Sequence, residues 1–193
     1  MSLQPIELDT PRLRLRTWRD SDRAAFAALN ADPRVMAHFP ALISREASDA
    51  SVDAFNAGFA ERGWSNWAVE RRDTGEFIGF TGLTIPKRSF PFSPCVEVGW
   101  RLAHAHWGLG FATEAALAAL ALGFERVGLA EIVSMTALTN TRSQAVMRRI
   151  GLVDAHFSFE HPGVPEGHAL RPHCLYRLSA AQWRMRADVA QGR

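Results

Sequence analysis

The chain has 193 residues, 47% of them hydrophobic and 22% charged, which suffices for one hydrophobic core and argues against disorder. The formal net charge of +2 gives no strongly basic surface, so we expect neither nucleic acid nor a membrane as a partner. There is no secretory signal pattern, and the longest apolar stretch, residues 115–123, is too short for a membrane span. A cytoplasmic location is therefore expected.

The two cysteines, Cys95 and Cys174, lie far apart in the sequence and in no spacing typical of metal ligands. We expect two reduced, half-buried thiols, as is usual inside the cell. A disulfide between them is the alternative.

The N-terminal part predicts a strand followed by a helix. Residues 12–16 alternate arginine with leucine, which predicts a strand with its leucines inward and its arginines on a solvated face. Residues 20–22 are two aspartates and a serine, which favour a helix cap. The helix that follows is expected to end before Asp32, which precedes a proline.

A second helix is expected over residues 48–61, with a stop at Gly63. The next signal is a β-hairpin, in which strands over residues 67–70 and 77–80 flank a turn. A proline-rich loop then leads to a strand at residues 96–102. Within that loop Phe90 and Phe92 are expected to be exposed and hint at an interface.

The C-terminal half continues with a helix after Gly110, a strand, a short helix and two further strands. The expected ranges after the first of these helices are 132–138, 143–150, 157–159 and 175–178. Strands and helices are mixed rather than strictly alternating. This order favours a mixed α/β sheet with helices on both faces over a doubly wound parallel sheet.

The most informative segment joins the strand at residues 97–102 to glycines that open a helix. Gly108 and Gly110 permit backbone angles that bring the chain close to a ligand. The free N–H groups of the helix's first turn form a site suited to a pyrophosphate. A turn whose glycines serve only its own geometry is the alternative interpretation.

Two nucleotide-binding motifs fit this segment less well. A Walker A loop needs a lysine after the glycines, and residues 111–113 contain none. A dinucleotide fingerprint needs a third glycine where Thr113 stands, near the first strand of its domain. Glu131 does fall at the distance that this fingerprint requires.

The segment at residues 107–112, Trp-Gly-Leu-Gly-Phe-Ala, resembles the pyrophosphate-binding signature of GNAT acetyltransferases, although Trp107 replaces the usual polar first residue. With the Thr-Glu-Ala that follows, it looks like the RimJ/RimL-like branch, the ribosomal-protein N-terminal acetyltransferases and their relatives. The resemblance covers residues 8–180. Its other matching segments are residues 10–16, 30–36, 75–79 and 140–152.

The resemblance implies a GNAT-type mixed α/β fold with a mostly antiparallel twisted sheet. Residues 1–193 are then a single acetyltransferase domain, with a core at about 8–180 and a tail at 181–193. It implies direct transfer of an acetyl group from acetyl-CoA to a primary amine, either a protein N-terminus or a small molecule, by a monomer or homodimer. A non-catalytic acyl-CoA-binding module and a nucleotide-dependent enzyme with a Rossmann-like core are the alternatives.

The resemblance also implies which residues bind acetyl-CoA. The backbone of two strand residues would pair with the pantetheine arm, loop and helix amides would hold the pyrophosphate, and an asparagine side chain would bind the pantetheine arm. These residues are Trp100, Leu102, Gly108, Leu109, Gly110, Phe111, Ala112, Thr113 and Asn140.

Two residues are the catalytic candidates. Ser143 would lie near the thioester sulfur and protonate the leaving thiolate, because Met147 stands where many GNAT enzymes carry a tyrosine acid. A structural role at the helix start is the alternative for Ser143. An amine arrives mostly protonated, so a base is needed, and Glu97 is the best-placed carboxylate, acting directly or through water. Its alternative role is to bind an arginine.

The histidines give weaker signals. His104 and His106 alternate beside the motif, but they lack a third ligand nearby, so no metal is expected. His161, His168 and His173 either line the mouth of the acceptor site or are ordinary loop residues.

Overall fold

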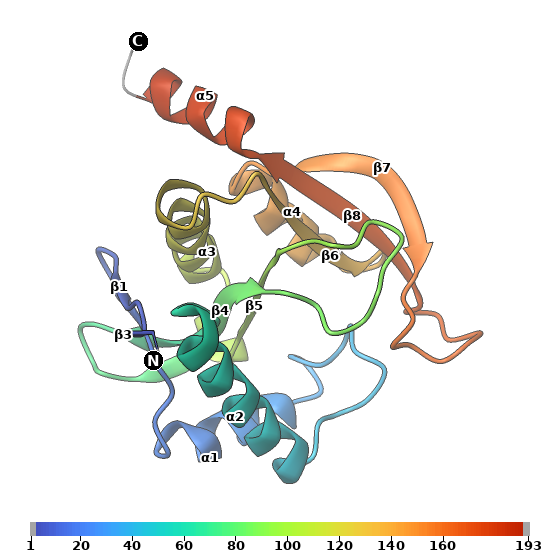
Figure 1. The fold of residues 1–193 in the computed structure, drawn as a ribbon. Helices are drawn as coiled ribbons and strands as arrows, with labels where there is room; N and C mark the ends of the chain where they lie inside the picture. Colours follow the sequence, from blue (N-terminus) through green and yellow to red (C-terminus); the bar gives the residue numbers. More distant parts are fainter. Residues whose placement is uncertain (1–2, 191–193) are drawn as a thin grey trace.

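The computed structural model describes residues 3–190 of the chain (Figure 1). Its sheet and helices follow one another in chain order as strands, helices and two short helical turns. They are β1 (Leu8–Asp9), β2 (Leu13–Arg16), α1 (Asp22–Asn30), α2 (Arg45–Arg62), β3 (Asn66–Arg71), β4 (Phe77–Thr84), β5 (Glu97–Leu102), the 3₁₀-helix η1 (His104–His106), α3 (Phe111–Ala121), the π-helical turn η2 (Leu122–Arg126), β6 (Glu131–Ala137), α4 (Thr141–Arg149), β7 (Val153–Glu160), β8 (Pro172–Ser179) and α5 (Ala180–Ala190).

All eight strands join one sheet in the order β1-β2-β3-β4-β5-β6-β8-β7. Every neighbouring pair is antiparallel except β5 and β6, which run parallel because α3 carries the chain back between them. The expected mixed and mostly antiparallel sheet is therefore confirmed. The predicted hairpin, the central strand and the short helix after β6 are also present.

The helices cover both faces of the sheet. Phe26 of α1 and Phe55 of α2 pack against Phe80 of β4, with ring centroids 5.8 and 5.6 Å from it. Leu83 lies three residues further along β4 and faces the other way, toward Gly123 at the end of α3. Figure 1 shows α1 and α2 side by side, apart from α3.

The short helix α4 lies on the same face as α3. Its capping residue Asn140 donates a hydrogen bond of 2.9 Å to the Thr136 hydroxyl on β6. Thr136 shares its face of β6 with Ile132, which lies next to Gly123. The two helix N-termini that follow β5 and β6 therefore belong to one face, opposite α1 and α2.

The prediction of a solvated arginine face on the first strand is wrong for Arg16. This side chain is 2% exposed and donates two hydrogen bonds to Asp22, of 2.7 and 2.8 Å, and one of 2.7 Å to Glu70. Alternation identifies the side of a strand but not what covers it, and α1 covers this end. Asp22 is thereby used for Arg16, and Ser21 makes no side-chain capping bond.

The expected exposure of Phe90 and Phe92 is also wrong in part. Phe90 is buried, Phe92 is half-buried, and the two rings stack 5.4 Å apart and meet Phe159 of β7. Their packing folds the proline loop onto the β7–β8 hairpin, so they no longer hint at an interface. Cys95 and Cys174 are both free thiols, as expected.

The C-terminal segment forms helix α5, where the sequence predicted a tail at residues 181–193, of which 191–193 lie outside the described residues. In Figure 1 this helix leads away from the sheet toward the C-terminus. Residues 1–2 of the expected single domain also lie outside the description. Among the helices described, none combines the length and apolar character that crossing a membrane requires.

Candidate functional site

The two parallel strands at the centre of the sheet separate soon after they meet. In the described part of the chain, β5 and β6 share a single residue pair, Glu97 with Val133. Beyond this point β5 stays paired with β4 as far as Leu102, whereas β6 stays paired with β8. We call the two facing edges, residues 99–102 and 135–137, the β5–β6 divergence.

The backbone of β5 presents alternate residues to this divergence. The carbonyls of Val96 and Val98 accept hydrogen bonds of 2.9 Å from β6, and Ala103 donates in the opposite direction, to β4. By the alternation of a strand, the N–H and C=O of Trp100 and Leu102 point toward β6. The Leu102 carbonyl already accepts from the Trp107 indole at 2.8 Å, so the peptide of Trp100 and the N–H of Leu102 remain.

The loop after β5 ends in an uncapped helix N-terminus. Gly108 and Gly110 have φ angles of 78° and 81°, in the left-handed region that favours glycine. Gly110 is the N-cap of α3 and has no side chain to accept from the first-turn N–H groups. The amides of residues 111–113 are therefore available to an anion at the positive end of the helix.

Two arginines flank this loop. Arg12 donates to the Leu109 carbonyl at 2.9 Å, and its Nε lies 2.6 Å from Glu114 in the first turn of α3. Arg142, in the first turn of α4, places its guanidinium 5.1 Å from the centre of the Trp107 indole ring. The sequence comparison missed Arg142, because only the fold brings the start of α4 beside position 107.

The asparagine and serine at the start of α4 bind one another. The Asn140 carbonyl oxygen accepts from the Ser143 backbone N–H at 3.2 Å, and its amide donates to the hydroxyls of Thr136 and Ser143 at 2.9 and 3.1 Å. Asn140 thus caps the helix. The Ser143 oxygen accepts a bond, so its own hydroxyl proton stays available for donation.

Glu97 lies on the other face of β5, at the point where the strands part. Its carboxylate accepts a hydrogen bond from the Met135 backbone N–H, and burial raises its pKa to about 7 despite that bond. Gly99 lies two residues along on the same face, and a Cβ placed on it would meet no atom within 4 Å. We call the side of β5 that carries Glu97, Gly99 and Arg101 the acceptor face.

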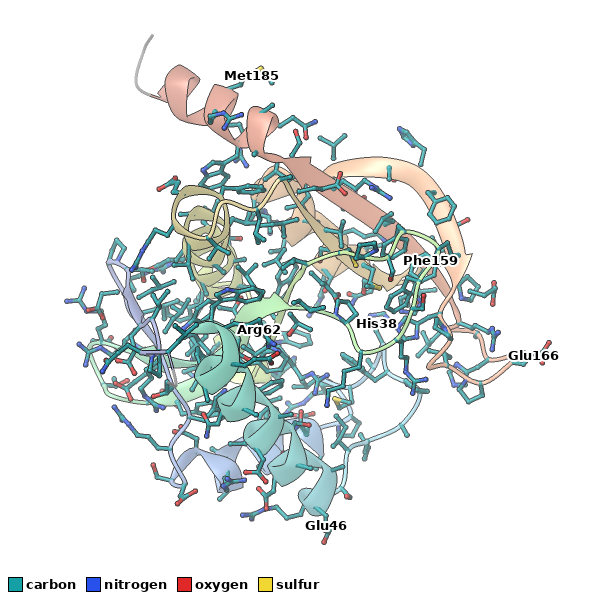
Figure 2. The ribbon with its side chains drawn as sticks, viewed as in Figure 1. His38, Glu46, Arg62, Phe159, Glu166 and Met185 are labelled. Atoms are coloured by element: carbon teal, nitrogen blue, oxygen red, sulfur yellow. The ribbon has the colours of Figure 1, made fainter. Side chains whose placement is uncertain are left out.

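The loop between α1 and α2 reaches across to the start of α4. His38, labelled in Figure 2, has its Nδ1 3.4 Å from the Thr139 hydroxyl. Its pKa is lowered by burial and by the nearby charge of Arg142. This contact links the α1–α2 side to the α3–α4 side near the end of the divergence.

The other histidines serve local packing in this structure. His106 is buried with its Nε2 3.2 Å from Glu76, and the rings of His161 and His173 lie 4.6 Å apart. Burial and the neighbouring His173 lower the pKa of His161 to about 4, which keeps it neutral near pH 7. His168 accepts a bond from the Leu170 N–H within its own loop.

The tyrosine that many relatives use has no substitute at the same position. Met147 is 1% exposed and fills the core beneath α4. The one tyrosine of the chain, Tyr176, is buried on β8 with its hydroxyl bonded to Arg148 at 2.8 Å. Ser143 is the hydroxyl that α4 carries beside the divergence.

Comparisons with known proteins agree on one family. The family model described as an acetyltransferase (GNAT) domain matches residues 12–153. An uncharacterized protein of Bacillus subtilis, YkkB, is 33% identical over 153 residues, covering 79% of this chain and 86% of YkkB. The FsC-acetyl coenzyme A-N(2)-transacetylase of Aspergillus fumigatus is 29% identical over 188 residues, covering 91% and 77%. The crystal structure of an acetyltransferase from Agrobacterium tumefaciens has a TM-score of 0.73 at 28% identity, covering 92% and 96%.

The raised pKa of Glu97 predicts a specific dependence of stability on pH. The folded protein keeps this proton up to about pH 7, whereas an unfolded glutamate loses it near its ordinary pKa of 4.5. Between these values the native state binds more protons, so the wild-type free energy of unfolding should fall as pH rises, by about 1–3 kcal/mol. Denaturant melts of Glu97→Gln from pH 4 to 8 should lack this fall.

Glu131→Gln is the matched control, because it removes an exposed carboxylate from the start of β6. A wild type and a Glu97→Gln variant with parallel stability curves would show that Glu97 titrates as an ordinary carboxylate.

Proposed function

Because the chain belongs to the GNAT acetyltransferase family and is an N-acetyltransferase, we propose that it moves an acetyl group from acetyl-CoA directly to a primary amine within a ternary complex. The family uses acetyl-CoA as its co-substrate. A protein N-terminus or a small molecule is the acceptor in this proposal. We also propose that residues 1–193 form one acetyltransferase domain of the RimJ/RimL-like branch, on the strength of the Trp107–Ala115 segment.

Acetyl-CoA fits the α3–α4 face of the divergence. Its pantetheine amides would pair with the peptide of Trp100 and the N–H of Leu102, as an added strand would. Its pyrophosphate would accept from the amides of residues 109–113, where Gly108 and Gly110 leave the backbone bare. Arg142 supports this placement, since it brings a cation beside Trp107, where the family signature has a polar residue.

Asn140 has a smaller part in this proposal than the resemblance implied. Its amide hydrogens are committed to Thr136 and Ser143, so only its carbonyl oxygen could accept a further hydrogen bond from the pantetheine arm. Its main contribution is to hold Ser143 at the start of α4.

The chemistry starts from the acceptor face. Glu97 takes a proton from the ammonium group of the acceptor, directly or through water, and the free amine attacks the thioester carbonyl. A backbone N–H in the stretch Trp100–Leu102 stabilises the oxyanion that develops. The C–S bond then breaks, and the Ser143 hydroxyl proton goes to the departing thiolate. No covalent enzyme intermediate forms.

The observation that carries this proposal is that Glu97 faces one side of the divergence while the bare helix N-terminus of α3 faces the other. A carboxylate with a pKa of about 7 accepts a proton most effectively near neutral pH. A module that only binds acyl-CoA has no need of a carboxylate with such a pKa. CoA release measured with a panel of amines separates the two functions, because a binding module releases none.

The first prediction concerns catalysis by Glu97. Glu97→Gln should lower kcat at pH 7 by roughly 10²–10⁴-fold and leave the Kd for acetyl-CoA nearly unchanged, because it removes the base but not the cofactor contacts. Part of the rate should return toward pH 10, where the amine loses its proton without help. Equal rates for wild type and Glu97→Gln across pH 6–10, with one verified acceptor, would remove Glu97 from the mechanism. Glu131→Gln again serves as the control.

The second prediction concerns the pyrophosphate loop. Gly110→Asp should weaken acetyl-CoA binding by at least about tenfold in calorimetry, because a side chain and a negative charge would meet the phosphates. Gly75→Asp is a matched control, since Gly75 also has a left-handed φ, of 70° against 81° for Gly110, but lies in the β3–β4 turn. The assignment is wrong if a folded Gly110→Asp protein binds acetyl-CoA as tightly as Gly75→Asp does.

A further inference from the structure

Arg101 brings a positive charge to the acceptor face. It lies on β5 two residues beyond Gly99 and four beyond Glu97, so all three share one side of the strand. Its Nη1 donates a hydrogen bond of 2.6 Å to the Asn30 carbonyl oxygen at the end of α1. The ring of Phe39, from the α1–α2 loop, lies 4.2 Å from the guanidinium carbon.

This guanidinium has only neutral neighbours. No carboxylate of residues 3–186 lies within 4.0 Å of it, and its Nε is buried without a hydrogen-bond partner. Removal from water with no nearby anion lowers the pKa of Arg101 to about 10. Arg16, the other strongly buried arginine, is surrounded by Asp22 and Glu70.

The residues around Arg101 hold it in place without neutralising it. Asn30 is fully buried, and its amide donates to the Ser48 hydroxyl of α2 at 2.9 Å, which fixes the carbonyl oxygen that receives Arg101. Phe39 covers one side of the guanidinium plane, as aromatic rings commonly do with arginine. A fixed, dehydrated cation with an unused donor is a preorganised site for an anion.

We propose that Arg101 binds a carboxylate of the acceptor, so that the substrate of this enzyme is an amine that also carries a carboxylate. The inference rests on the proposed function, because it places the reacting amine at Glu97. Gly99 leaves space between the two groups, where the chain that joins amine and carboxylate would lie. The carboxylate accepts from Nε and from the terminal nitrogen that Asn30 does not use, in the two-bond geometry typical of arginine.

The strand spacing further defines this substrate. Glu97 and Arg101 are four residues apart on an extended strand, which separates their Cα atoms by about 13 Å. The amine and carboxylate of a free α-amino acid are too close together to reach both groups. An amine several bonds from its carboxylate, as in the lysine side chain or a short peptide, matches the spacing.

Matched amine pairs that differ only in the carboxylate test this inference. The probes are Nα-acetyl-lysine, 6-aminohexanoate and Ala-Ala-Ala, each compared with its own C-terminal amide. One measurement is kcat/KM from CoA release. The other is calorimetric binding of the same probes to the protein saturated with CoA, which requires no turnover.

The wild type should favour at least one acid over its amide by at least about tenfold in both measurements. Arg101→Gln should remove this preference mainly through KM, and Arg101→Lys should keep part of it. Arg126→Gln, at an exposed position beyond α3, should keep all of it. The wild-type comparison stands by itself if Arg101→Gln does not fold.

The outcomes separate the two proposals. Acetylation of acids and amides at equal rates overturns the role of Arg101 and leaves N-acetyl transfer intact. Preferential binding of acids without acetylation of any probe supports Arg101 as an anion site and counts against the proposed function. Neither binding nor turnover with any probe overturns both.

Discussion

The central physical constraint in this fold is that two parallel strands meet at a single residue pair and then part. Each strand is held on its far side, β5 by β4 and β6 by β8, so the divergence is kept open by the rest of the sheet. Peptide groups in a sheet interior normally pair with a neighbouring strand. Here the edge of Trp100 faces the divergence, and a ligand with its own amides can take the place of the missing strand.

The divergence also separates two kinds of chemistry. Helices α3 and α4 direct their N-termini to one face, where Gly108, Gly110 and Arg142 suit a polyanion. The opposite face carries Glu97 and Arg101, each with its pKa moved toward neutrality by burial. One face therefore suits the phosphates of a cofactor, and the other suits a small molecule that brings an amine and a carboxylate. The alternation of side chains along β5 is what keeps these two sets apart.

Local patterns in the sequence were enough for much of the fold. Strand alternation, the glycines before α3 and the Asn140–Ser143 spacing are features of short segments, and each predicted an element that is present. The misses concern contacts between distant segments. The burial of Arg16 depends on α1 lying over it, and the neutral surroundings of Arg101 depend on Asn30, which is 71 residues away in sequence. Periodicity gives the side on which a residue lies but not its partners.

The central claim is that acetyl-CoA occupies the divergence from the α3–α4 side. A crystal structure of the protein with CoA tests it most directly. The account predicts the pyrophosphate at the amides of residues 109–113 and the pantetheine arm beside Trp100, with the sulfur between Ser143 and Glu97. CoA bound with its phosphates away from the start of α3, or with β5 and β6 paired beyond Val98, would contradict it.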